Sequence, residues 1–248
     1  MQKPQIEIAR DSLDLAERMV RLFLSAADDA IASRGVFHIA LSGGRTPERF
    51  LERLAGVPRV GRFPWDRVHL FWVDERYVPP DSQASNYRLV ARTLLCRIDM
   101  PEANVHRIPT EFEDMTDAAL AYGRTMREVF RLEANGIPQF DLVVLGMGSD
   151  GHTASLFPNS PVVRDADHLA SVVPAGDTVK PARITLTRPV LRAARRVAML
   201  VSGAEKSHTL KRVFLGEPDE MRYPVQVLWP VLERVVWLVD REAAGEIM

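Results

Sequence analysis

The chain has 248 residues, a length that suits one compact domain with a sizeable core. Its 32 lysine and arginine residues against 33 aspartate and glutamate residues give a formal net charge of −1, so no overall basic field favours nucleic acid or a membrane surface. The N-terminus lacks the charged-then-apolar pattern of a signal peptide, and no run approaches the roughly 18 apolar residues of a membrane span.

The one cysteine, Cys96, rules out a disulfide within the chain and favours a reducing cytoplasm. Because Cys96 falls in a helical-looking segment, we expect it to be a core residue. We therefore expect a cytoplasmic protein.

The first half of the chain alternates strand and helix patterns. Asp11 or Ser12 is expected to cap the first helix, and Gly35 to end it. After the next strand, Thr46 is expected to cap a helix with Pro47 at its first position. The predicted elements are strand 5–9, a helix from residue 11 or 12 to residue 35, strand 36–41, helix 47–54, loop 56–64, strand 68–73, helix 85–97, strand 105–108 and helix 116–133, the last ended by residues 135–136.

The second half begins with a buried-looking strand, Phe140 to Leu145, that breaks into a glycine-rich turn. The further predicted strands are 169–173, 183–187, 197–201 and 235–239, with a helix ending near 215; the first two of these strands are expected to form an antiparallel edge. Regular alternation of strand and helix predicts an α/β fold, with a doubly wound, largely parallel sheet and helices on both faces. We expect a single domain over residues 1–248.

Polar motifs follow four of the predicted strands. The carboxyl ends of parallel strands share one edge of a sheet, where open α/β sheets bind ligands, so residues far apart in sequence are expected to meet there. The motifs are Ser42-Gly43-Gly44, Asp74-Glu75-Arg76, Asp150-Gly151-His152 and Lys206.

The Ser42-Gly43-Gly44 turn has the character of a phosphate cradle, because glycines let backbone N–H groups approach an anion and a helix N-terminus follows. Taken alone it fits a tight strand-to-helix turn equally well, and it matches neither the nucleotide P-loop nor the dinucleotide fingerprint. Arg76 and Lys206, expected at the same edge, favour the phosphate interpretation.

His152 stands in a glycine-flanked turn beside an acid. A histidine titrates near pH 6.5 and can take a proton from water, while a carboxylate such as Asp150 orients its ring. We interpret the five other histidines as structural. No spacing of His, Cys or carboxylates indicates a metal site, and no serine lies in a Gly-x-Ser-x-Gly elbow.

With these motifs the chain resembles the 6-phosphogluconolactonase family, within the wider glucosamine-6-phosphate isomerase/deaminase superfamily. The similarity covers nearly the whole chain. It rests on Ser42-Gly43-Gly44-x-Thr46-Pro47, Trp72-Val73-Asp74-Glu75-Arg76, Ser85-Asn86-Tyr87, Gly146-Met147-Gly148-x-Asp150-Gly151-His152-Thr153-Ala154-Ser155-Leu156-Phe157-Pro158 and Gly203-Ala204-Glu205-Lys206.

The resemblance implies a doubly wound α/β enzyme that hydrolyses 6-phospho-D-glucono-1,5-lactone to 6-phosphogluconate without a cofactor or a metal. It implies His152 as general base, with Asp150 beside it. The expected phosphate contacts are Ser42, Gly43, Gly44, Arg76 and Lys206, and Asp74 and Gly148 are expected elsewhere in the substrate pocket. Arg45 departs from the small residue usual there, and it is left outside the expected site.

Two alternatives stay open. A glucosamine-6-phosphate isomerase/deaminase shares the glycine turn but typically reads Asn-Glu-Pro where this chain has Leu156-Phe157-Pro158, and Asp-Glu-Tyr where it has Asp74-Glu75-Arg76. A sugar-phosphate sensor usually carries a DNA-binding appendage, and no basic helix-turn-helix precedes Val36. We expect a sugar-phosphate lactone as the partner, no nucleic acid or membrane, and a monomer.

Overall fold

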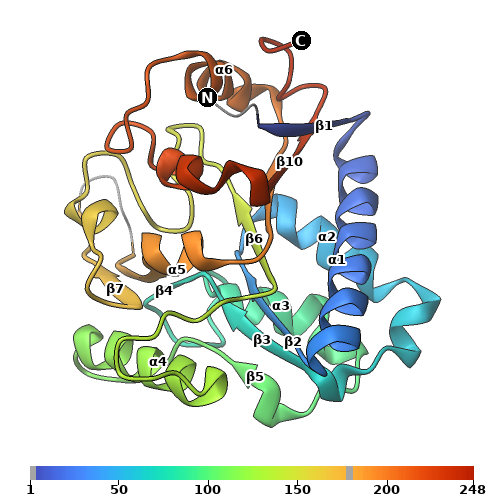
Figure 1. Cartoon of the computed structure of the whole chain (residues 1–248), viewed down its shortest axis with the longest axis vertical. Helices are drawn as coiled ribbons and strands as arrows, with labels where there is room; N and C mark the ends of the chain where they lie inside the picture. The colour runs from blue at the N-terminus through green and yellow to red at the C-terminus, as the bar shows by residue number, and fades with distance from the viewer. Residues whose placement is uncertain (1–3, 177–180) are drawn as a thin grey trace.

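A computed structural model describes residues 4–176 and 181–248 of the chain. Within them, seven parallel strands form the main sheet in the order β1-β10-β9-β6-β2-β3-β5 (Figure 1). The strands are β1 (Gln5–Ala9), β2 (Phe37–Leu41), β3 (Val68–Trp72), β5 (Val105–His106), β6 (Leu142–Gly146), β9 (Val197–Val201) and β10 (Val235–Asp240). The predicted doubly wound α/β fold is therefore confirmed.

The central strands are apolar because helices or loops cover both of their faces. All five residues of β9 are buried, as are the first four of β6. Such continuous apolar runs are typical of parallel strands in the middle of an α/β sheet. This pattern made these strands predictable to within about two residues.

Helices α1 (Ser12–Arg34) and α2 (Arg45–Ala55) lie on one side of the main sheet, and α5 (Arg188–Ala193) lies on the other (Figure 1). As predicted, Asp11 caps α1 by accepting hydrogen bonds from the N–H groups of Leu13 and Asp14. The remaining helices are α3 (Asn86–Thr93), α4 (Met115–Phe130) and α6 (Ser207–Leu215). In the part of the chain that the structure describes, none of the helices is long and apolar enough to span a bilayer.

The start of α2 differs from the prediction. The helix begins at Arg45 and Gly44 is its N-cap, with φ of 101°, so Thr46 is a helical residue and not the cap. A positive φ is open to glycine without strain, which lets the chain turn from β2 into the helix within three residues. The cap contributes no side chain, so the first backbone N–H groups of α2 stay available to a ligand.

The predicted antiparallel edge is a separate sheet. Strand β4 (Asp74–Arg76) pairs antiparallel with β8 (Arg183–Leu186), which pairs antiparallel with β7 (Ala170–Val173). The two sheets meet at Val73, whose N–H donates to Leu41 of the main sheet at 2.9 Å and whose carbonyl accepts from Leu186 at 2.7 Å. Residues 74–76 are thus a strand of the small sheet and not a loop after β3.

The expectation that Cys96 is a core residue was wrong. Helix α3 ends at Thr93 because Leu94 leaves helical backbone angles, and Cys96 then lies exposed in a short 3-10 turn. Its Sγ donates to the carbonyl of Arg92 at 3.1 Å. Helix α4 also ends earlier than predicted, at Phe130. Arg131, in a left-handed backbone conformation, is its C-cap, whereas residues 135–136 were expected to end the helix.

Candidate active site

The carboxyl ends of the main-sheet strands surround a cavity of about 610 Å³. We call it the substrate cavity. Every predicted site residue except Asp150 lines it, and Asp150 contacts the cavity-lining His152. The residues that line it and were predicted are Ser42, Gly43, Gly44, Asp74, Arg76, Gly148, His152 and Lys206. The expectation that these motifs share one sheet edge is therefore confirmed in geometry.

The glycine turn after β2 brings backbone to the cavity wall. A Cβ added at Gly43 would lie 1.8 Å from Oδ1 of Asn86, so only glycine fits against that amide. Ser42 is buried, and its hydroxyl oxygen has no hydrogen-bond partner among the described residues. A buried polar atom without a partner is rare in a folded protein, so this hydroxyl is a candidate for a contact with a ligand or an ordered water.

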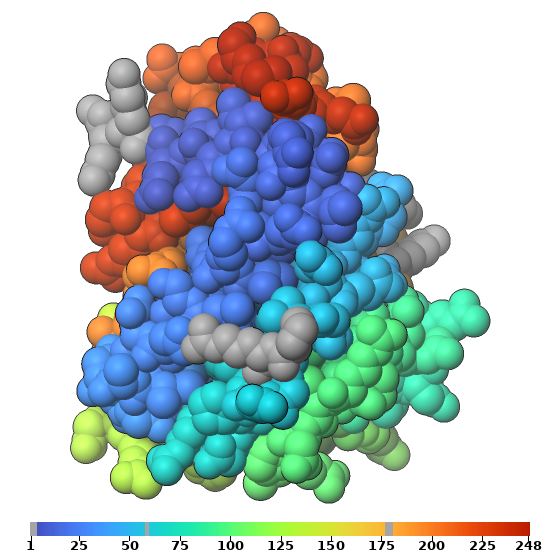
Figure 2. Space-filling model, turned by 90° about the vertical axis from the view of Figure 1, so that its right-hand side faces the viewer, coloured from blue at the N-terminus to red at the C-terminus, as the bar shows by residue number. Residues whose placement is uncertain are grey.

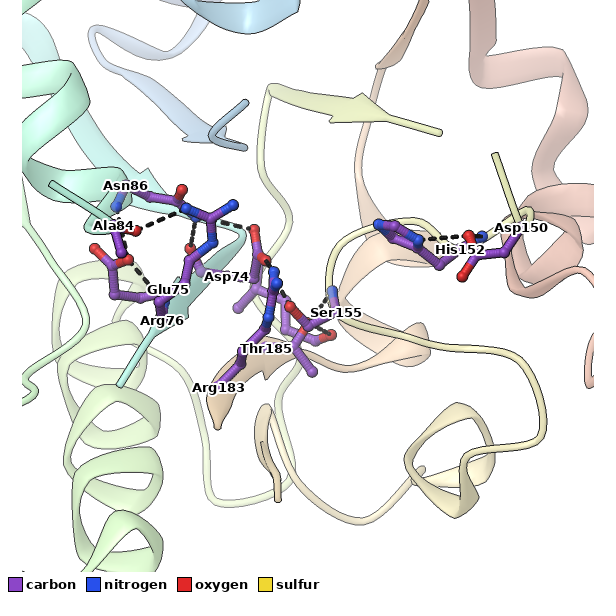
Figure 3. A network of polar contacts seen from close by, with 11 residues as sticks. Asp74, Glu75, Arg76, Ala84, Asn86, Asp150, His152, Ser155, Arg183 and Thr185 are labelled. Carbon is purple, nitrogen blue, oxygen red and sulfur yellow. Dashed lines mark hydrogen bonds and ion pairs between the residues drawn. The ribbon is translucent and has the colours of Figure 1, made fainter. Parts of the chain in front are cut away.

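The turn after β6 holds His152. Its Nδ1 lies 2.6 Å from Oδ1 of Asp150, whose carboxylate also accepts the His152 backbone N–H at 3.1 Å. Gly148 is required here, because a Cβ at that position would lie 2.1 Å from the imidazole Nδ1. Figure 3 shows the ring extending from Asp150 toward the polar network around Asp74. With Nδ1 held by the carboxylate, Nε2 is the nitrogen left for proton transfer.

Electrostatics keep the Asp150 carboxylate ionised. Burial alone would raise the pKa of this carboxyl, but the hydrogen bond from the His152 side chain, together with the charge and backbone N–H of His152, outweighs burial and lowers the pKa. An ionised Asp150 can hold the Nδ1 proton and stabilise the imidazolium that forms when Nε2 accepts a proton. The pair is therefore chemically suited to general base catalysis.

Across the cavity from His152, buried Glu75 organises the polar network. Its carboxylate accepts backbone N–H groups of Arg76, Asn86 and Tyr87, each at 2.7 Å, and the Ser85 hydroxyl at 3.0 Å. Burial raises the pKa of Glu75, and these four donors oppose that rise. The carboxylate fixes the start of α3 to β4 and so positions the side chains that reach the cavity.

Asp74 and Arg183 form the next layer of this network (Figure 3). Asp74 Oδ2 accepts the Ser155 hydroxyl at 2.6 Å and lies 3.7 Å from the Arg183 guanidinium. Arg183 lies over the ring of Phe157, 5.3 Å from its centroid, and that ring lies 4.6 Å from the His152 ring. A continuous set of contacts thus links Asp74 to His152.

Two guanidinium groups at this wall are incompletely satisfied. Nε of Arg76 and Nε of Arg183 are buried and have no hydrogen-bond partner among the described residues, although Arg76 also donates to the carbonyl of Ala84 at 2.7 Å. Burial lowers the pKa of Arg183; Asp74 opposes this, and the positive charge of Arg76 adds to it. Two neighbouring cations with free donors make a favourable position for an anion.

Sequence reasoning missed Arg183 and Asn86 as cavity residues. Arg183 is an isolated charge at the start of the otherwise apolar predicted strand 183–187, and this could have indicated a role in the site. However, only the pairing of β4 with β8 sets Arg183 opposite Arg76. Ser85 or Asn86 was expected to cap α3; Ser85 is the cap, and the Asn86 side chain donates to the Asp74 carbonyl at 2.9 Å.

Lys206 enters the cavity from the turn after β9, where Gly203 has φ of 103°. Asp240, at the end of β10, is buried and accepts the Gly203 N–H at 3.2 Å. Partial burial lowers the pKa of Lys206, the charges of Glu205 and Asp150 oppose this, and Arg45 adds to it. Arg45 itself is 93% exposed and lies 3.7 Å from Glu205, at the cavity mouth.

His152 is the only one of the six histidines that lines the substrate cavity. His38, His69 and His106 instead form a cluster on neighbouring strands of the main sheet, with a 2.9 Å contact between ring nitrogens of His69 and His106. Among residues 4–176 and 181–248, no group of three or more His, Cys, Asp or Glu side chains could hold a metal ion. The metal-free mechanism stays a prediction.

Known proteins resemble this chain over its full length. Residues 10–237 match the family described as glucosamine-6-phosphate isomerases/6-phosphogluconolactonase. A 6-phosphogluconolactonase of Synechocystis sp. is 40% identical over 244 residues, which cover 98% of each chain.

Solved structures agree with this similarity. The 6-phosphogluconolactonase of Trypanosoma brucei has a TM-score of 0.87 at 29% identity and covers 100% of both chains. That of Thermotoga maritima has a TM-score of 0.81 at 33% identity, over 96% of this chain and 100% of the other.

Proposed function

The chain belongs to the family of glucosamine-6-phosphate isomerases and 6-phosphogluconolactonases, and we propose that its substrate cavity hydrolyses 6-phospho-D-glucono-1,5-lactone to 6-phospho-D-gluconate. The observation that carries this proposal is the arrangement of one cavity: a histidine–carboxylate pair stands on one side, and the half-buried Arg76 and Arg183 stand on the other. The activity places the enzyme in the oxidative pentose phosphate pathway.

The substrate phosphate binds to the cations and to the glycine turn. Arg76 and Arg183 offer guanidinium groups that line the cavity, and the Ser42-Gly43-Gly44 turn and the N–H groups at the start of α2 add donors. Lys206 adds a further charge from β9. This remote anchoring supplies binding energy and orients the lactone carbonyl toward His152.

His152 supplies the chemistry. A lactone carbonyl is electrophilic enough for water to attack once a base takes its proton, so no nucleophilic side chain is needed. Nε2 of His152 removes a proton from water as the new C–O bond forms, giving a tetrahedral oxyanion. The ring C–O bond then breaks, and the imidazolium returns its proton to the departing ring oxygen. Asp150 holds Nδ1 throughout and is a positioning residue.

The alternative isomerase/deaminase chemistry is disfavoured by what lies against His152. That branch is expected to carry an acid at the position of Phe157. Here the Phe157 ring lies 4.6 Å from the imidazole and under the Arg183 guanidinium. An apolar ring cannot shuttle the protons that aldose–ketose isomerisation moves.

The test is a direct assay of purified protein with freshly prepared 6-phosphogluconolactone, with glucosamine 6-phosphate, and with unphosphorylated gluconolactone. The rate of spontaneous lactone hydrolysis, which rises with pH, is subtracted. We expect turnover of the phosphorylated lactone, a much lower kcat/KM without the phosphate, and no ammonia from glucosamine 6-phosphate. Ammonia release without lactone turnover would overturn the assignment.

The monomeric state and cytoplasmic location stay predictions from the sequence.

A further inference from the structure

A second cavity, of about 560 Å³, lies away from the substrate cavity. It is bounded by α1, by the edge strand β1 and by the amino-terminal part of β10. Figure 2 shows α1 in blue on this face of the molecule, with orange-red atoms from the C-terminal part of the chain beside it. None of the described residues lines both cavities, so a ligand here would leave the substrate cavity free.

Arginine dominates the lining of the second cavity. Arg18 and Arg21 come from α1, and Arg195, Arg196 and Arg234 come from the segments that lead into β9 and β10. The lining holds two carboxylates, Glu7 and Glu233, and Asp14 and Asp141 outside it pair with Arg18 and Arg195, so five arginines face four carboxylates and one positive charge remains in surplus. This local surplus stands out in a chain whose net charge is −1.

The ion pairs leave several of these guanidinium donors unused. Arg195 lies 3.5 Å from Asp141, and Arg234 lies 3.4 Å from Glu233. Arg18 donates to Asp14 at 3.3 Å and lies 3.8 Å from Glu7, while its buried Nε has no hydrogen-bond partner among the described residues.

Among the residues that the structure describes, neither Arg21 nor Arg196 has a carboxylate oxygen within 4.0 Å of its guanidinium nitrogens. Guanidinium groups that are not paired with a carboxylate, such as those of Arg21 and Arg196, suit phosphate oxygens, which they bind through two hydrogen bonds at once.

The rest of the lining restricts the ligand further. The apolar residues are Leu22, Val236 and Leu238, and no aromatic side chain is present to stack on a nucleotide base. The arginines stand on two sides, on α1 and before the strands, so one ligand can meet cations at both of its ends. The volume falls within the range of sites for small organic ligands.

We propose that the second cavity binds a small, non-aromatic anion that carries two phosphate groups. Inorganic pyrophosphate and a hexose bisphosphate share this chemistry. The apolar floor favours the organic anion, because carbon atoms can cover Leu22 and Val236 there.

Isothermal titration calorimetry at about 0.15 M salt tests the proposal. The background protein carries Arg76→Gln and Lys206→Gln, which weaken anion binding in the substrate cavity. Pyrophosphate and fructose 1,6-bisphosphate should still bind this protein at one site, and inorganic phosphate should bind at least about tenfold more weakly because it meets one bank of arginines only.

Adding Arg21→Gln and Arg196→Gln should weaken the binding of pyrophosphate and of fructose 1,6-bisphosphate about 10- to 100-fold. The thermal unfolding temperature should be unchanged, because neither arginine is in an ion pair. The matched control, Arg62→Gln with Arg164→Gln, changes two arginines outside both cavities and should leave binding intact.

Three results would overturn the proposal: no binding to the background protein, binding that survives Arg21→Gln with Arg196→Gln, or equal binding of phosphate and pyrophosphate. Tighter binding of pyrophosphate than of the hexose bisphosphate would reject the organic ligand while keeping the site.

Discussion

His152 and the cluster of His38, His69 and His106 differ in what surrounds each imidazole. His152 contacts a carboxylate at 2.6 Å and lines the substrate cavity. In the cluster, His69 and His106 contact each other, and His106 stacks on Phe71, with 4.5 Å between ring centroids. Burial, followed by the charges of the other two histidines, lowers the pKa of His106 to about 4. His152 is therefore equipped to take a proton, whereas burial and the neighbouring histidines disfavour protonation of His106.

The largest effect expected from this comparison comes from removing His152. His152→Ala should lower kcat by about 10²–10⁴-fold, the usual contribution of a positioned acid–base group, with little change in KM. The acid limb of the kcat/KM profile against pH should vanish, because only a neutral imidazole accepts the proton. A folded variant that retains the parental enzymatic rate, after subtraction of spontaneous hydrolysis, would reject the general base assignment.

The cations across the cavity should affect binding more than the chemical step. Arg76→Gln and Lys206→Gln should each lower kcat/KM roughly 10- to 100-fold, mainly through KM, because each removes a charge-assisted contact to phosphate. Arg45→Gln is the matched control: its exposed ion pair with Glu205 is weak, so kcat/KM should change less than about fivefold. Steady-state kinetics on the lactone measure these changes. Equal losses of kcat/KM in all three variants would contradict a localised phosphate site.

Asp150→Asn tests whether the carboxylate distinguishes His152 from the cluster. The amide keeps the shape but removes the negative charge, so kcat should fall about 10- to 100-fold while KM stays within about twofold. Asp150→Glu should recover part of the activity if reach allows. An unchanged kcat in Asp150→Asn would show that the carboxylate is dispensable for the chemistry.

The cluster should affect stability in acid and leave catalysis alone. The pKa of His106 is lower in the folded protein than in the unfolded chain, so the unfolded chain binds more protons as pH falls from about 6.5 to about 4, and stability falls over that window. His106→Phe should reduce the acid-induced loss of unfolding free energy by about 1–2 kcal/mol. This is less than the full pKa shift would give, because the ring is partly exposed. Urea unfolding at pH 7 and pH 5 measures it, and kcat at pH 7 should be unchanged. An identical pH dependence of the unfolding free energy in the variant and the parent would contradict this role of His106.

The smallest expected effect is none at all. EDTA should leave lactone hydrolysis intact, because water activation is assigned to His152 alone. Turnover lost on chelation and restored by a divalent ion would sink that assignment.

The sequence predicted the buried strands and the main motifs because both depend on local patterns. Strand β1 and β9 have the predicted bounds, and the motifs after β2, β6 and β9 line one cavity. Arg183 joined the site through a strand pairing between residues about a hundred positions apart, which no local pattern encodes. Cys96 was misplaced because one residue, Leu94, ended the helix early. Local patterns thus give elements, whereas pairing between distant segments decides which side chains meet.

The pairing of β1 with β10 also affects how the protein folds during its synthesis on the ribosome. Gln5 pairs with Val236 and Ala9 with Asp240, so β1 has no strand neighbour until β10 has left the exit tunnel. Domains fold as units and long-range parallel pairs form slowly. Arg10 and Asp240, which continue and end these two strands, both line the substrate cavity. A nascent chain stalled before residue 235 is therefore expected to lack a complete cavity and to leave the edge of β9 open to chaperones.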